Sequence, residues 1–261
     1  ITDEYVVLSD CDVICNVDFN DMIEYHKKSG ADMTFAVKNT KLDREKASAN
    51  TLLFSDSDGR INDVLVYPTD FEGCADISLN MVVMNTSYLR QIITDAIAHN
   101  YTSLSRDIIS KNFGKLNYRI YRYDGYFACI SSFSDYYRSS LELLSNSSAR
   151  DSLFSVKNRP VYTKVRNSSP AYYSEKSSVK NSMIADGCYI EGTVENSIIF
   201  RGVKVGKNAT VKNSIIMQDA IIGDGAFLNC VITDKNAVIR DGVMLCGADV
   251  QPYYVAKGKM I

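Results

Sequence analysis

The C-terminal third of the chain carries a repeat whose spacing excludes most folds. From Val179 onward, apolar and mostly β-branched or aliphatic residues recur at steps of four to six residues, most often six. An α-helix would require a spacing near 3.6 residues, and an ordinary strand a spacing near two. Hexapeptide spacing with Asn and Gly at the corners is typical of a parallel β-helix, in which three hexads form one triangular coil. We therefore predict a left-handed parallel β-helix over residues 179–261.

A second signature accompanies this spacing. Four tetrads of the form N-[SC]-[IVM]-I begin at Asn181, Asn196, Asn213 and Asn229, separated by 15, 17 and 16 residues. In a β-helix the aliphatic residue of each hexad points inward and stacks on the equivalent residue of the next coil. We expect the four tetrads to stack in register.

The residues before the repeat follow a different pattern, in which strand-like and helix-like segments alternate. Such alternation predicts an open α/β sheet. Asn20 and Thr86 are candidate helix N-caps, and Gly30 is a candidate helix stop. The expected strands are 5–8, 31–38, 52–54, 61–67, 77–84, 118–123 and 126–130, and the expected helices are 20–29, 86–99, 104–110 and 133–144. We expect an α/β domain at 1–145, a Ser- and Asn-rich connector at 146–178, and the β-helix after it.

Charge and composition narrow the partners and the compartment. The net charge is −2 and no Lys or Arg cluster stands out, so neither a nucleic acid nor a membrane surface is expected as a partner. No apolar stretch approaches 18 residues, and the first residues lack the features of a signal peptide. The seven cysteines are odd in number and form no C-x-x-C pair, which favours reduced thiols and a cytoplasmic location.

Several segments resemble one enzyme family. The stretch from Ser177 to Ile239, the segment "RPVYT" at 159–163 and the segment "SRDIIS" at 105–110 are similar to ADP-glucose pyrophosphorylases (glucose-1-phosphate adenylyltransferases), and within them to the GlgD-type subunit. The resemblance implies part of a nucleotidyltransferase (Rossmann-like) α/β domain followed by a left-handed β-helix. The family's glycine-rich nucleotide loop would lie before Ile1, so we expect this sequence to lack that N-terminal segment.

The family's reaction implies a metal site. The phosphate of glucose 1-phosphate attacks the α-phosphorus of ATP and releases pyrophosphate, and Mg²⁺ neutralises charge during the transfer. By resemblance, Asp12 and Asp107 stand at the metal-binding positions, although a one-residue shift would place Asp10 there instead of Asp12. The alternative is a structural role, with Asp12 in a strand-end loop and Asp107 paired with Arg106 on a helix.

The sugar-phosphate contacts of the family are altered. Its E-K-P segment, whose Lys binds the phosphate of glucose 1-phosphate, is replaced by Val66, Tyr67 and Pro68. Losing such a charged hydrogen bond costs about 1.5–3 kcal/mol. Of the family's S-M-G-x-Y segment, Ser78 survives as a substrate-binding candidate, while Asn80 replaces the Gly. We therefore expect no catalytic residue, and we interpret Asp12 and Asp107 as remnants of a metal site.

These observations predict a regulatory subunit of ADP-glucose pyrophosphorylase in glycogen synthesis, non-catalytic or weakly catalytic. It would form a hetero-oligomer with the catalytic subunit, and self-association is a further possibility. Two alternatives stay open: an active glucose-1-phosphate adenylyltransferase, and a purely structural β-helix protein. A hexapeptide-repeat acyltransferase is rejected, because such enzymes use a His between coils as general base, whereas His26 and His99 both precede the repeats.

Overall fold

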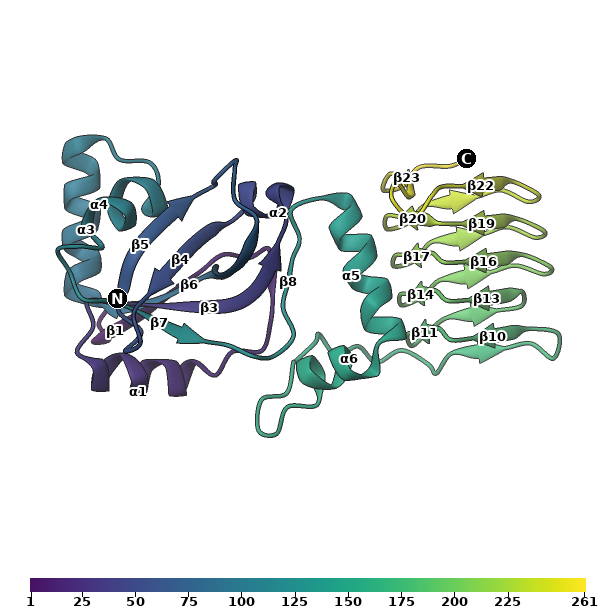
Figure 1. Ribbon diagram of the computed structural model, residues 1–261. Coiled ribbons are helices and arrows are strands. Elements are labelled where there is room, and N and C mark those ends of the chain that lie inside the picture. Colours follow the sequence, from purple (N-terminus) through teal and green to yellow (C-terminus); the bar gives the residue numbers. More distant parts are fainter. The chain divides into compact units, whose positions relative to one another are not determined.

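The N-terminal unit is built on a six-stranded mixed sheet (Figure 1). The computed structural model describes residues 1–261, which divide into two compact units, 1–127 and 128–261. In the first unit the strand order is β5-β4-β6-β3-β7, and β1 also pairs with β6. The β3–β7 pair is parallel and the other pairs are antiparallel. The strands are β1 (Tyr5–Ser9), β3 (Met33–Leu42), β4 (Thr51–Ser55), β5 (Ile61–Val66), β6 (Gly73–Asn85) and β7 (Tyr118–Arg122).

Helices cover both faces of this sheet. Alternate residues of each central strand point to opposite faces and belong to two separate apolar clusters. In β6, Val82 and Met84 pack with residues of α3 (Thr86–His99) and of the π-helix η1 (Leu104–Ile109). The neighbouring residue Val83 points to the opposite face and packs with α1 (Phe19–Ser29) and α2 (Arg44–Ser48). The predicted α/β architecture is confirmed. The short elements β2 (Val13–Ile14) and α4 (Ser110–Asn112) complete this unit.

Two residues predicted as helix N-caps do not cap their helices in the structure. Helix α1 is capped by Asp18, whose side chain accepts hydrogen bonds from the Asn20 and Asp21 backbone N–H groups, so the prediction of Asn20 as the cap was wrong. Gly30 ends the helix in the left-handed conformation, as expected. Helix α3 starts at Thr86, whose hydroxyl donates to the Asp3 carbonyl instead of capping its own helix.

The second unit contains a parallel β-helix of three five-stranded sheets (Figure 1). The first sheet has β10 (Ser178–Lys180), β13 (Thr193–Glu195), β16 (Thr210–Lys212), β19 (Phe227–Asn229) and β22 (Met244–Cys246). The second has β11 (Met183–Ile184), β14 (Ile198–Ile199), β17 (Ile215–Ile216), β20 (Val231–Thr233) and β23 (Tyr253–Val255). The third has β9 (Tyr172–Tyr173), β12 (Tyr189–Ile190), β15 (Lys204–Val205), β18 (Ile221–Ile222) and β21 (Val238–Ile239). The hexapeptide prediction is confirmed.

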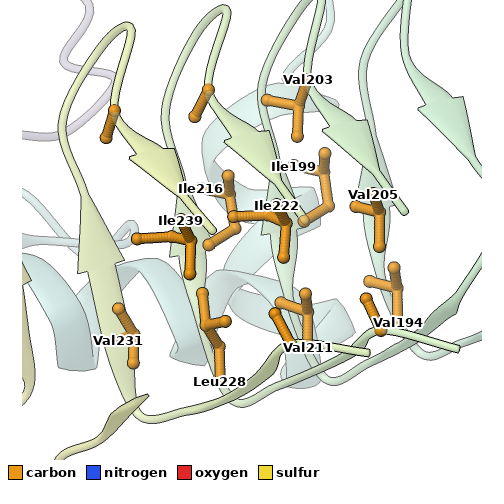
Figure 2. Close-up of a cluster of buried hydrophobic side chains, with 14 of the residues drawn as sticks. Val194, Ile199, Val203, Val205, Val211, Ile216, Ile222, Leu228, Val231 and Ile239 are labelled. Carbon is orange, nitrogen blue, oxygen red and sulfur yellow. The ribbon is translucent and has the colours of Figure 1, made fainter. Parts of the chain in front are cut away.

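Inward-pointing aliphatic residues from successive coils fill the interior (Figure 2). In the third sheet, Ile190, Val205, Ile222 and Ile239 stack in register and are at most 1% exposed. Residues with this shape suit the narrow interior, because each packs on its equivalent one coil away.

Polar ladders fix the corner between the first and second sheets. Asn181, Asn196 and Asn213 all adopt positive φ and are joined by side-chain amide hydrogen bonds. The fourth tetrad is one residue out of the expected register. Ile215 pairs with Ile232, so Cys230, with φ +53°, occupies the corner position, and Asn229 precedes it.

Helix α5 (Phe133–Ser145) lies against the second sheet. Tyr137 of this helix is buried with Ile215, Cys230 and Ile232, and its hydroxyl donates to the Asn213 carbonyl at 2.6 Å. The composition of the sequence predicts a domain boundary near residue 145. The compact units meet at Phe127 and Ala128 instead, so α5 is part of the β-helix unit.

The connector expected at 146–178 contains regular structure. Helix α6 (Ser147–Phe154) follows α5, with the Asn146 side chain as its cap, and β9 joins the third sheet. The short strand β8 (Ala128–Cys129) precedes α5. None of the helices combines the length and the apolar character needed to cross a lipid bilayer.

Candidate functional site

One row of residues crosses five strands of the N-terminal sheet and contains the expected sugar-phosphate positions. Val66 of β5 pairs with Thr51 of β4, and the β4–β6 register continues from Thr51 to Ser78. Ser78 pairs with Val37 of β3, which pairs with Arg122 of β7. Residues paired across strands point to the same face. The sheet therefore brings Ser78 and Val66 into one row, with a cation at its far end.

Ser78 is held in a distorted part of β6. It is buried, and its hydroxyl accepts a hydrogen bond from the Asn80 N–H at 3.1 Å. Asn80 has φ +52°, a conformation that Asn tolerates better than most residues. The Asn80 carbonyl accepts from the Asp10 N–H at 3.2 Å, which ties the loop after β1 to this part of the sheet.

Tyr67, which the sequence resemblance aligns with the phosphate-binding Lys, follows directly after β5. It has φ +53° and its side chain is 48% exposed. Its N–H donates to the Asn50 carbonyl at 3.1 Å, which fixes the backbone, while Val66 packs against the core. A phenol hydroxyl at this point offers one neutral donor, whereas a Lys would offer an ammonium group.

Arg122 is a cation that the sequence interpretation did not single out. Its guanidinium donates to the Asp76 carboxylate at 2.9 Å, and the second oxygen of Asp76 accepts from the Asn39 amide at 2.8 Å. The Asp76 side chain is 7% exposed and that of Arg122 is 56% exposed. An Asp within an apolar strand pattern was the signal for this pair, because a buried carboxylate requires a partner. The charge of Arg122 is therefore largely balanced by Asp76.

The structure places Asp12 in the loop after β1, where it is half-buried. One of its carboxylate oxygens, Oδ1, is buried without a hydrogen-bond partner. A buried carboxylate oxygen in that state is costly unless a donor or a cation reaches it.

Asp107 is held by its own segment. Its carboxylate accepts hydrogen bonds from the Thr102 and Ser103 N–H groups, at 3.0 and 3.1 Å, and Lys111 lies 3.5 Å away. The two backbone hydrogen bonds, followed by the charge of Lys111, lower the pKa of Asp107. Asp107 thus holds the N-terminus of η1, whose cap residue is Ser103, and its ion pair is with Lys111 instead of the expected Arg106.

Asp12 and Asp107, the two carboxylates expected to share Mg²⁺, do not line a common hollow. Asp107 lines a hollow of about 560 Å³ formed by α3, η1 and α4, and Asp12 is not among the residues that line it. No group of three His, Cys, Asp or Glu side chains in the chain is arranged to hold a metal ion. A Mg²⁺ site is usually completed by several oxygen ligands. The residues present do not fit a two-carboxylate site, and we derive no metal-dependent step.

Comparison with known proteins agrees with the architecture. Residues 168–254 match a family model described as GlmU-like, C-terminal hexapeptide. The glycogen biosynthesis protein GlgD of Bacillus subtilis is 31% identical over 206 residues, which cover 79% of this chain and 49% of that protein. GlgD of Geobacillus stearothermophilus is 38% identical over the same shares. The glucose-1-phosphate adenylyltransferase of Thermosipho africanus is 31% identical over 210 residues, again 79% and 49%.

The chain spans about half the length of the curated relatives that it matches. The hexapeptide β-helix agrees with the matched family model, and the sequence similarity is to GlgD and glucose-1-phosphate adenylyltransferase. The resemblance inferred from the sequence is confirmed: over 79% of its length this chain is similar to GlgD proteins and to glucose-1-phosphate adenylyltransferases.

Proposed function

We propose that this chain is part of a regulatory, non-catalytic or weakly catalytic subunit of ADP-glucose pyrophosphorylase. In this role it would associate with the catalytic subunit, which converts ATP and glucose 1-phosphate to ADP-glucose and pyrophosphate during glycogen synthesis. Its stacked β-helix supplies rigid flat faces suited to such an assembly. The observation that carries the proposal is Tyr67, a neutral side chain where the reaction requires a cation.

The electrostatics of the row around Ser78 support this proposal. A phosphate monoester at Ser78 would need a positive partner, and the cation in the row is Arg122. Two strand spacings, about 10 Å, separate the two backbones. Asp76 already neutralises Arg122 at 2.9 Å, and moving the guanidinium to a ligand would leave the buried Asp76 carboxylate with only the Asn39 amide. Removing one partner of such a pair is costly, so Arg122 is a poor substitute for the missing Lys.

A calorimetric titration with glucose 1-phosphate tests this reasoning. We expect no binding by the unmodified chain at millimolar ligand, and measurable binding by Tyr67→Lys. A restored charged hydrogen bond of about 1.5–3 kcal/mol corresponds to a gain of roughly 10- to 150-fold in affinity. Tyr162→Lys is the matched control, because Tyr162 is 88% exposed and lies in the connector. Tight binding by the unmodified chain would refute the proposal.

The regulatory role has a separate test. The full-length protein that contains this chain is mixed with the glucose-1-phosphate adenylyltransferase of the same organism, and ADP-glucose formation is followed. We expect the mixture to differ from the adenylyltransferase alone in rate or effector response, and the protein alone to show little activity. Identical rates with and without it would end the regulatory interpretation.

One observation favours an active enzyme as the second candidate. Asp12 Oδ1 is buried without a partner, in the loop that the Asp10–Asn80 hydrogen bond ties to the Ser78 region. A ligand that donates to this oxygen would relieve its cost. Robust turnover by the full-length protein alone would establish this alternative.

A further inference from the structure

The third sheet of the β-helix carries a row of outward-pointing residues that runs the length of the stack. Parallel pairing aligns one such residue from each strand, and a bridge from Val238 to Met260 adds a sixth position. We call these residues the outer row; in coil order they are Tyr172, Tyr189, Lys204, Ile221, Val238 and Met260.

The outer row is apolar at five of its six positions, and it is exposed. Tyr172 is 48% exposed, Tyr189 42%, Ile221 41% and Met260 54%, and the rings of Tyr172 and Tyr189 stack at 4.3 Å. The other two sheets differ. The second is covered by α5, and the first carries polar outward residues that include the Glu195–Lys212 ion pair at 3.1 Å.

The size of the outer row indicates an interaction surface. Six coils at about 4.8 Å per coil give a length of about 24 Å. A large side chain has a surface of about 150–250 Å², so each of the four exposed residues leaves on the order of 100 Å² accessible to solvent. The outer row therefore presents roughly 400–500 Å² of apolar surface. Exposed apolar patches of this size on soluble proteins are commonly binding sites.

We propose that the outer row is the centre of an interface between two copies of this chain, packed face to face with their β-helix axes antiparallel. The two-fold axis would lie along the strand direction, between the third and fourth coils. Tyr172 then meets the partner's Met260, Tyr189 meets the partner's Val238, and Lys204 meets the partner's Ile221. The contact is isologous, so each pairing occurs twice. The aliphatic stem of Lys204 can lie along Ile221 while its ammonium group stays in water.

Charges beside the outer row favour this orientation. The residue that follows the inward position is Glu191 in the second coil and Arg240 in the fifth, and antiparallel packing brings Glu191 opposite the partner's Arg240. One residue further along, Lys207 of the third coil meets the partner's Asp224 of the fourth. Packing with parallel axes would instead place Lys204 against the partner's Lys204. The charge pattern is complementary in only one of the two symmetric arrangements.

The flanking charged residues also enlarge the surface that the proposed interface would bury. A stable interface buries about 800 Å² on each partner, and the outer row supplies roughly half of that. Interfaces typically surround an apolar centre with a polar rim. The rim here consists of Glu191, Arg240, Lys207, Asp224 and their equivalents on the second copy. The proposed interface therefore has both an apolar centre and a charged rim.

Sedimentation equilibrium of the full chain tests the proposal through substitutions at Ile221. Ile221→Lys sets two lysines against each other and is expected to weaken dimerisation on the order of tenfold or more, while Ile221→Glu faces the partner's Lys204 and is expected to retain it. Met244→Lys, at a 71% exposed residue of the first sheet, is the matched control and should leave the dimer unchanged. Because Ile221 is exposed, none of these changes is expected to disturb folding, which circular dichroism checks.

A charge exchange supplies an independent measurement. Glu191→Arg and Arg240→Glu should each weaken the dimer, and the double variant should restore it. A chain that is monomeric at tens of micromolar would overturn the proposal. So would equal effects of Ile221→Lys and Ile221→Glu, or a surface protected only after addition of the adenylyltransferase relative, which would assign the row to a different partner.

Discussion

Ser182, Ser197 and Ser214 form a serine ladder inside the β-helix, in which each hydroxyl accepts a hydrogen bond from a backbone N–H of the next coil. This ladder makes a sharp stability prediction at Ser214. This residue is 0% exposed, and its hydroxyl donates to the Lys212 carbonyl at 2.5 Å and accepts from the Val231 N–H of the next coil at 3.1 Å. Ser214→Ala removes both bonds. The Lys212 carbonyl keeps a second donor, the Cys230 N–H at 3.2 Å. The Val231 N–H, in a residue that is also 0% exposed, is left without an acceptor.

The expected loss of stability follows from the one backbone N–H, that of Val231, left without a hydrogen bond. A buried polar group left unpaired costs about 1–3 kcal/mol. For a unit of this size, 1 kcal/mol corresponds to a shift of about 3–5 °C in the unfolding midpoint. Ser214→Ala is therefore expected to lower the midpoint by between about 3 and 15 °C.

Thermal unfolding of the full chain, followed by circular dichroism, measures the effect. Ser177→Ala is the control, because the Ser177 hydroxyl donates to the Ser174 carbonyl at 2.7 Å, and that carbonyl also accepts the Ser177 N–H. The control should shift the midpoint by about 2.5 °C or less. If Ser214→Ala were no more destabilising than Ser177→Ala, the ladder would not hold the coils together in the way described.

Two further predictions concern backbone conformation and pH. Asn213 has φ +45°, a conformation that Gly adopts more easily than Ala. Asn213→Ala should therefore be less stable than Asn213→Gly by about 1 kcal/mol, measured by urea unfolding. Both variants lose the side-chain hydrogen bond to Asn229, so equal stabilities would contradict the argument. Burial lowers the pKa of His26, so its neutral form is favoured in the folded chain, and stability that is complete above about pH 6.5 should fall as the pH drops through the lowered pKa. His26→Gln should flatten that slope between pH 7 and 5, whereas His99→Gln, at an exposed residue, should not.

The β-helix could be predicted because its interior imposes one requirement at regular intervals. Each coil needs small branched aliphatic residues at its inward positions, and that requirement is visible in the spacing of the sequence. The slip in the fourth tetrad was not visible, because Asn229 and Cys230 match the repeat by residue type. The corner needs a left-handed residue, and the 17-residue coil places Cys230 there, while Asn229 still accepts the ladder bond from Asn213.

The candidate site was less accessible to prediction. The register that aligns Ser78 with Val66 and Arg122 depends on a bulge between Phe35 and Val37 and on the positive φ of Asn80. Neither follows from the period of a strand pattern, since a one-residue change of register moves every side chain to the other face. The roles of Asp107 and Asp76 likewise depend on contacts with residues distant along the chain or on an irregular helix.

Helix α5 changes how the β-helix can unfold. In a simple solenoid each coil contacts only its neighbours, so coils at an end can separate one at a time. Here Tyr136, Tyr137 and Leu141 of a single helix pack with Ile198, Ile215 and Ile232, which belong to three successive coils. Because the same helix contacts all three coils, they should unfold together. Amide hydrogen exchange should therefore be slow and uniform across β14, β17 and β20 and faster in the terminal coil.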